Sequence, residues 1–252
     1  NIDVEGERQL RPVYGIIHDE PLDERVAADL KGFRGIGPVR IGNDAHDQLQ
    51  LDVYGEVIHA AAQFAARGRQ FDRDTARFLN TLGETVCQRW READEGLWEG
   101  RSGRFQHTHS KVLCWVALDR LIAMHDRGLL DADVQRFRAE RDALRSQIEE
   151  RGYNDALGSY TGTLDGDDLD ASLLTLPLYG YADAASPRMR STLARIRERL
   201  GVNGLIYRYD RSTPDGSPPG EGAFGICSFL AVEFLPLAGD VEAAVAAFER
   251  LL

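Results

Sequence analysis

The stretch Gly96-Leu97-Trp98-Glu99 organises the whole sequence, because it forms a Gly-flanked loop between two long segments of helical periodicity. A polar run follows it: Arg104-Phe105-Gln106-His107-Thr108-His109-Ser110-Lys111. An indole next to a carboxylate suits a sugar-cleaving site, since the apolar face of a sugar can lie on the ring while the acid reaches the glycosidic oxygen. The alternative interpretation is a Trp packed on the rim of the fold beside a solvated Glu.

The segments on both sides of this loop predict an all-α fold. Apolar residues recur at helical spacing in about eight segments, which are residues 44–67, 73–91, 110–127, 131–151, 169–178, 187–200, 222–236 and 240–252. Residues 1–43 are interrupted by Gly and Pro and predict short strands and turns, with one brief helix near residues 22–30. Residues 205–209 alternate as a strand does.

Mainly apolar helical segments alternate with more charged ones, and residues 131–151 are expected to lie on the outside. Such pairs predict a toroid of inner and outer helices with the long loops at one mouth. Periodicity alone fits an α-solenoid or an irregular bundle as well. The long loops carry carboxylates beside aromatic or Arg side chains, and this composition suits the binding of hydroxyls and sugar faces.

Composition excludes several classes of partner. The formal charge of -11 and the pI near 5.0 argue against nucleic acid and anionic membrane surfaces, because like charges repel. No apolar run is long enough to span a membrane and no signal-like segment opens the sequence, so we expect a cytoplasmic location. The three cysteines lack metal-ligand spacing and are expected to be buried thiols.

We expect no metal and no cofactor. An acidic run, Asp165 to Asp170, invites a calcium interpretation, but it lacks the closing Glu of a calcium-binding loop. A solvated acidic loop or the rim of a pocket is therefore favoured. The spacing of His107, His109 and Lys111 does not indicate a metal site either.

Five collinear segments carry a resemblance to a known family. They are Gly37-Pro38-Val39-Arg40-Ile41-Gly42-Asn43 with Gln50 to Glu56, Gly96 to Glu99, His109 to Arg120, Leu169 to Leu174, and Glu221 to Phe224 with Cys227-Ser228-Phe229. In order and spacing they resemble the bacterial glucoamylase and trehalase group of glycoside hydrolase family fifteen. The resemblance implies an (α/α)6 toroid of about twelve helices that removes glucose from α-glucosides with inversion and without a metal.

The resemblance also implies roles for individual residues. Glu99 is expected to be the general acid, with Trp98 lining the pocket and Arg208 and Tyr209 in the substrate-binding part of the site. A buried ion pair is the other interpretation of Arg208. His109 and Lys111 are expected beside the acid loop, either in contact with substrate or as structural hydrogen-bonding groups.

Parts of the family pattern are missing. An inverting enzyme needs a second carboxylate as base, and the family carries it in a segment beyond Leu252. Glu221, at the start of a helix, is a competing candidate for the base, or a carboxylate that only stabilises that helix. We therefore expect residues 1–252 to be one partial catalytic domain, with about eight of twelve helices, without the family's N-terminal β-sandwich and terminal helices, and inactive alone.

Two other functions stay open at this point. The first is a non-catalytic carbohydrate-binding or scaffold protein on the same toroid, and the second is an epimerase or lyase on a related toroid, which would centre on His instead. The expected partner is an α-glucoside or a glucan. The sequence does not indicate which one, nor the oligomeric state.

Overall fold

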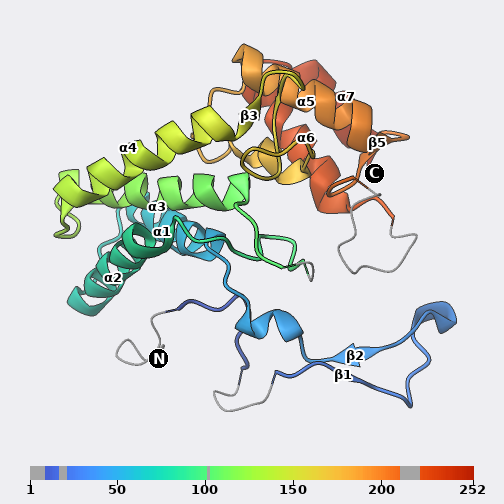
Figure 1. Cartoon of the computed structure of the whole chain (residues 1–252), viewed down its shortest axis with the longest axis horizontal. Helices are drawn as coiled ribbons and strands as arrows, with labels where there is room; N and C mark the ends of the chain where they lie inside the picture. Colours follow the sequence, from blue (N-terminus) through green and yellow to red (C-terminus); the bar gives the residue numbers. More distant parts are fainter. Residues whose placement is uncertain (1–8, 17–21, 101–102, 211–221) are drawn as a thin grey trace.

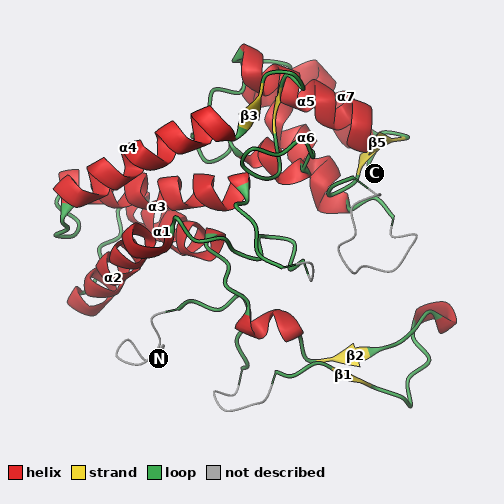
Figure 2. Cartoon of the chain, in the orientation of Figure 1, coloured by secondary structure: helices red, strands yellow, loops and turns green. Residues whose placement is uncertain are grey.

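The computed structural model describes residues 9–16, 22–100, 103–210 and 222–252, and helices dominate this part of the chain (Figure 2). Its α-helices are α1 (Asp52–Ala66), α2 (Arg73–Arg89), α3 (Thr108–Asp126), α4 (Val134–Arg151), α5 (Pro187–Leu200), α6 (Gly225–Leu237) and α7 (Val241–Glu249). Three short 3-10 helices accompany them: η1 (Phe33–Gly35), η2 (Asp44–Asp47) and η3 (Ala171–Thr175). The fold class is all-α, as predicted.

The strands form three separate two-stranded antiparallel hairpins. They pair β1 (Arg25–Val26) with β2 (Arg40–Ile41), β3 (Tyr153–Asn154) with β4 (Ser159–Tyr160), and β5 (Gly201–Val202) with β6 (Leu205–Ile206). The β1–β2 hairpin projects away from the helices, whereas the other two lie among them (Figure 1).

Helix α3 forms the centre of the structure. Residues 112–118 are all buried, and α3 packs against α1, α2, α4 and η3 (Figure 1). Only Phe137, Leu144 and Ile148 of α4 are buried, so α4 is an outer helix, as its charge predicts. α1 packs against α3, α3 against η3, and η3 against α6, so these four elements form an inner layer. Each of them also contacts the next helix in the chain, and these helices, α2, α4, α5 and α7, form the outer layer.

This arrangement is four inner–outer pairs, and it confirms the prediction of an incomplete toroid with about eight of twelve helical positions. One inner position differs from the prediction. The expected helix over residues 169–178 is the short 3-10 helix η3, where the Asp170 carboxylate caps the start by accepting from Ser172 N. Pro177 follows closely, and its lack of an N–H prevents regular α-helical bonding there.

Two other expectations are corrected near the N-terminus. The brief helix near residues 22–30 is strand β1 and a turn, because the amides there bond across the hairpin to the β2 side. The helix expected over residues 44–67 is divided into η2 and α1. Leu49 and Leu51 lie between η2 and α1. Leu49 N donates to the Glu95 carboxylate and Leu51 N to the Asp94 carboxylate, both in the loop after α2.

All three cysteines are buried and unpaired by disulfides, as expected from their apolar contexts. Among the described helices, none has the length and apolarity that crossing a lipid bilayer requires.

Candidate active site

The loop between α2 and α3 is tied to the helices at both of its ends. Asp94 and Phe105 exchange two backbone hydrogen bonds of 3.0 and 2.9 Å, which close the loop at its base. The Asp94 carboxylate accepts from Ser110 Oγ at the start of α3 (2.8 Å) and from Leu51 N before α1 (3.0 Å). The loop that carries Trp98 and Glu99 therefore sits where α1 and α3 both begin.

Lys111 belongs to this framework and not to the cavity. Its side chain is fully buried, and Nζ donates to the carbonyl oxygens of Trp90 (2.6 Å) and Glu92 (2.5 Å) at the end of α2. Of the two interpretations that the sequence left open for Lys111, its position matches the structural one. The ammonium group satisfies the carbonyl of Trp90, the C-cap of α2, and that of Glu92 in the turn that follows.

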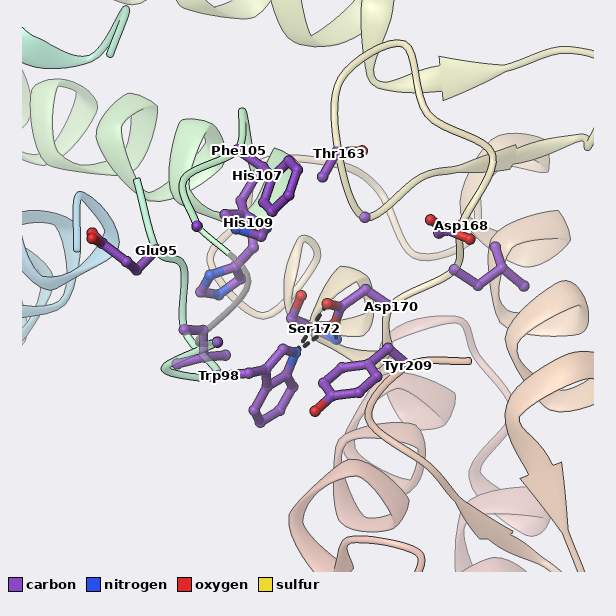
Figure 3. A pocket seen from close by; sticks show the side chains of 15 residues that line it. Glu95, Trp98, Phe105, His107, His109, Thr163, Asp168, Asp170, Ser172 and Tyr209 are labelled. Carbon is purple, nitrogen blue, oxygen red and sulfur yellow. Dashed lines mark hydrogen bonds between the residues drawn. The ribbon is translucent and has the colours of Figure 1, made fainter. Parts of the chain in front are cut away.

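A cavity of about 290 Å³ opens beside this loop (Figure 3). Residues of three segments line it: the Trp98 loop with the first residues of α3, the turn from residue 162 to the start of η3, and Tyr209 in the segment after β6. Its lining side chains include Trp98, Phe105, His107, His109, Asp170 and Tyr209. The acidic turn is thus the rim of a pocket, as one sequence interpretation proposed.

Trp98 is fixed from several sides. Its Nε1 donates to both carboxylate oxygens of Asp170, at 3.0 and 2.9 Å. The guanidinium carbon of Arg208 lies 5.7 Å from the centre of the Trp98 ring, and Phe224 meets the ring edge to face at 6.1 Å. Arg208 also lies 5.3 Å from the ring of Tyr209. The predicted residues Trp98, Arg208 and Tyr209 are therefore brought together.

His109 lies at the inner wall of the cavity. It is 4% exposed, and its Nδ1 has no hydrogen-bond partner among the described residues. Burial, reinforced by the nearby His107, lowers the pKa of His109 to about 3. His109 is therefore a neutral imidazole at ordinary pH and can donate or accept one hydrogen bond.

Gly96 allows the loop to pass close to the start of α3. A Cβ on Gly96 would lie 2.6 Å from Cδ2 of His107, and the residue has φ +73, in the left-handed region. Glycine meets both demands at this position.

Glu99 lies in the same loop, between two residues that line the cavity. It has φ 55 and accepts a hydrogen bond of 3.2 Å from Asn43 Nδ2 on Oε2. The other end of the Asn43 amide caps η2 by accepting from Ala45 N, so the amide is oriented with its NH2 toward Glu99. Within the described part of the chain, Trp98 and Gly100 line the cavity and Glu99 does not.

Two buried carboxyl groups stand behind the loop. Asp52, the first residue of α1, is 2% exposed and Asp94 is fully buried, and Oδ1 of each has no hydrogen-bond partner in the described residues. Burial, and next the neighbouring Asp94, raise the pKa of Asp52 from 3.8 to about 7. Burial also raises the pKa of Asp94, although Leu51 N and Ser110 oppose this by donating to it.

This pKa shift predicts a pH-dependent stability. The unfolded chain ionises Asp52 near pH 4, whereas the folded chain keeps it protonated to about pH 7, so unfolding becomes easier as pH rises between these values. The full effect is at most ~4 kcal/mol. We expect Asp52→Asn to reduce the fall in Tm between pH 5 and pH 8, measured by thermal unfolding. The same substitution at exposed Asp167 is the control, and an unchanged pH dependence in Asp52→Asn would contradict the assignment.

Other predicted residues have different positions. Glu221 lies outside the described residues, so its candidacy as a base stays a prediction. Two carboxylates of the acidic run that invited a calcium interpretation have separate partners: Asp165 pairs with Arg151 at 2.5 Å, and Asp170 accepts from Trp98 Nε1. Among the described residues, no three His, Cys, Asp or Glu side chains gather as metal ligands would.

Sequence reasoning did not single out Asp170 as a partner of Trp98. The available signal was an Asp directly before the Ala-Ser-Leu-Leu run, which is a capping position. That signal predicts the hydrogen bond to Ser172 N (2.7 Å) but gives no reason to expect an indole 72 residues away.

Comparisons with known proteins find similar sequences among trehalases. The chain is 36% identical over 244 residues to a trehalase of Mycobacterium tuberculosis, a match that covers 96% of this chain and 36% of that protein. It is 32% identical over 250 residues to a trehalase of Thermoplasma acidophilum, covering 99% of this chain and 42% of that protein. The chain therefore spans well under half the length of these relatives.

Solved structures support the fold. A glycosidase in complex with glucose superposes with a TM-score of 0.69 at 22% identity, over 84% of this chain and 57% of that one. A glucoamylase from Saccharomycopsis fibuligera gives a TM-score of 0.50 at 16% identity, over 61% of this chain and 37% of that one. Residues 3–249 match the model of the family described as Glycosyl hydrolases family 15, so the resemblance in the sequence motifs is confirmed and the chain belongs to this family.

Proposed function

We propose that the protein to which this chain belongs removes glucose from α-glucosides by an inverting acid–base mechanism, and that residues 1–252 alone are inactive. The observation that carries the proposal is the fixed indole of Trp98 in a cavity next to Glu99, with Arg208 and Tyr209 on the same side. The trehalases and the glucose-bound glycosidase described above make a glucosyl unit the expected occupant.

Three side chains bind the glucosyl unit in this proposal. The apolar face of the glucosyl ring lies on Trp98, and the guanidinium of Arg208 donates to sugar hydroxyls. The neutral imidazole of His109 supplies one further hydrogen bond from the inner wall. These contacts hold the glycosidic bond beside the loop that carries Glu99, which lies between the lining residues Trp98 and Gly100.

The reaction needs one proton donor and one proton acceptor. The protonated Glu99 carboxyl gives its proton to the glycosidic oxygen as the bond to the anomeric carbon breaks. A water molecule attacks that carbon from the opposite face and loses a proton to a second carboxylate, so the anomeric configuration inverts. Glu221 and a carboxylate of the full-length protein outside residues 1–252 are the candidates for this base.

A non-catalytic carbohydrate-binding protein is the second candidate. One observation favours it: Glu99 is not among the described residues that line the cavity, and its carboxylate is bonded to Asn43. On this alternative the cavity binds a glucosyl unit but no proton is delivered.

The test is a substrate panel on the full-length protein, with trehalose, maltose, isomaltose and soluble starch, followed by NMR of the released glucose. Inversion predicts that starch releases β-glucose first. It predicts equal initial amounts of α- and β-glucose from trehalose, because only the attacked half inverts. Initial release of α-glucose alone contradicts inversion, and saturable glucose binding without turnover on any substrate favours the binding protein.

A further inference from the structure

Asp170 occupies an unusual position in the cavity wall. It precedes η3, its carboxylate accepts from Ser172 N at 2.7 Å, and both of its oxygens also accept from Trp98 Nε1. Its side chain lines the same cavity as the indole (Figure 3). One carboxylate therefore connects the start of an inner helical segment to the indole ring that lines the cavity.

The hydrogen bond restricts the ring of Trp98. An indole has one N–H donor, and a bond to a carboxylate is stronger than a bond between neutral groups. The N–H of Trp98 is bonded to Asp170, and the ring of Phe224 packs against the indole at an interplanar angle of 74°. Rotation of the Trp98 side chain would therefore break at least one of these contacts. The ring orientation is thus set before any ligand arrives, which lowers the entropic cost of binding.

The backbone at Asp170 and Ala171 also contacts the segment that carries Arg208. The backbone of Asp170 forms a bridge with Tyr209, and Ala171 N donates to the Arg208 carbonyl at 2.7 Å. The guanidinium of Arg208 then returns to the Trp98 ring. Trp98 and Arg208 are therefore both linked to the segment that begins η3: the Asp170 carboxylate bonds to Trp98, and the backbone next to Asp170 bonds to Arg208 through Ala171 N.

We propose that Asp170 is a positioning residue of the sugar-binding cavity, whose carboxylate fixes the Trp98 indole in the orientation on which a glucosyl ring stacks. This inference rests on the proposed function for the identity of the ligand. The contact between Asp170 and Trp98 is independent of it, and the two can be tested separately.

The contact is tested by the indole N–H resonances of the 252-residue chain, which has three Trp residues. Trp90 Nε1 donates to Glu140 at 2.7 Å, Trp98 donates to Asp170, and Trp115 Nε1 has no acceptor among the described residues. Each resonance is assigned by replacing one Trp with Phe. We expect Asp170→Asn to move only the Trp98 resonance upfield, because a neutral amide oxygen deshields the proton less than a carboxylate does.

Glu140→Gln is the matched control, since it makes the same chemical change at the other carboxylate–indole pair and is expected to move only the Trp90 resonance. Asp170→Asn keeps an oxygen that can cap η3, so the fold is retained. A Trp98 resonance that stays in place in Asp170→Asn would overturn the proposed contact.

The effect on the ligand is tested by a double-mutant cycle with glucose as the probe. We expect Asp170→Ala to weaken glucose binding about tenfold, and to weaken it less than about twofold in a Trp98→Phe background, where the indole N–H is absent. Asp170→Asn should restore part of the affinity. Equal losses in both backgrounds would mean that Asp170 acts only on the fold and would overturn the positioning role.

The experiments distinguish a failure of the positioning role of Asp170 from a failure of the proposed function. If the wild-type chain does not bind glucose while the Trp98 resonance responds to Asp170→Asn, the contact stands and the sugar-binding role is overturned together with the proposed ligand. If glucose binds and the cycle shows no coupling, the proposed function stands and the positioning role is overturned.

Discussion

Replacing Glu99 by Gln in the full-length protein is expected to lower the turnover of α-glucosides by about 10²–10⁴-fold, with little change in glucose binding. A Gln side chain has nearly the same shape and can still accept the hydrogen bond from Asn43 Nδ2, so the loop geometry is retained. It has no proton to give to the departing glycosidic oxygen. The measurement is kcat and KM on the best substrate of the panel, with glucose affinity determined separately.

The structure provides a matched control for this prediction. Asp168 is an exposed carboxylate that lines the cavity beside the Trp98 loop, so Asp168→Asn removes a negative charge close to the proposed sugar-binding site. We expect it to lower turnover by less than about tenfold, because it leaves the proton donor intact. Near-normal turnover in Glu99→Gln, or a larger loss in Asp168→Asn, would remove Glu99 from the role of general acid.

The dependence of turnover on the leaving group is a second test of Glu99 as the general acid. Aryl glucosides with good leaving groups need little protonation, so Glu99→Gln should retain more of its activity on them than on trehalose. A general acid predicts this dependence on the leaving group. A residue that only holds the loop would reduce turnover on both kinds of substrate by the same factor.

The pairing of helices could be predicted because it depends on local properties of the sequence. The long α-helices begin and end close to the predicted residues, since apolar periodicity and capping residues such as Ser186 before α5 act within a few residues. The predictions failed where distant side chains compete for backbone amides. Leu49 and Leu51 donate to side chains more than 40 residues away, and no periodicity reports that competition.

In the site, too, local features could be predicted from the sequence and long-range contacts could not. The position of Trp98 beside Glu99 is visible in the sequence, because the two residues are adjacent. The partners of Trp98 come from the residue before η3 and from the segment after β6, so only the tertiary structure brings Asp170 to its Nε1 and Arg208 to its ring. Lys111 shows the opposite case: the family resemblance left substrate contact and structural hydrogen bonding both open, and its burial gives it carbonyl partners.

Replacing Gly55 by Ala is expected to destabilise the chain by at least about 3 kcal/mol, and to lower Tm by roughly 6–12 °C. Gly55 lies on the buried face of α1, where α1 crosses α3. A Cβ there would lie 2.3 Å from the carbonyl oxygen of Leu113 and 2.7 Å from its carbonyl carbon. These are backbone atoms of the central helix, so no change of side-chain rotamer can relieve the clash.

Gly225→Ala is the control, because Gly225 is also helical and a Cβ there meets nothing within 4 Å. Ala favours a helix over Gly, so this substitution should leave Tm unchanged or raise it slightly. Thermal unfolding followed by circular dichroism distinguishes the two variants. Because α1 and α3 both begin at the Trp98 loop, separating them should also weaken glucose binding in Gly55→Ala, and a variant with normal Tm and normal binding would contradict the close approach of these helices.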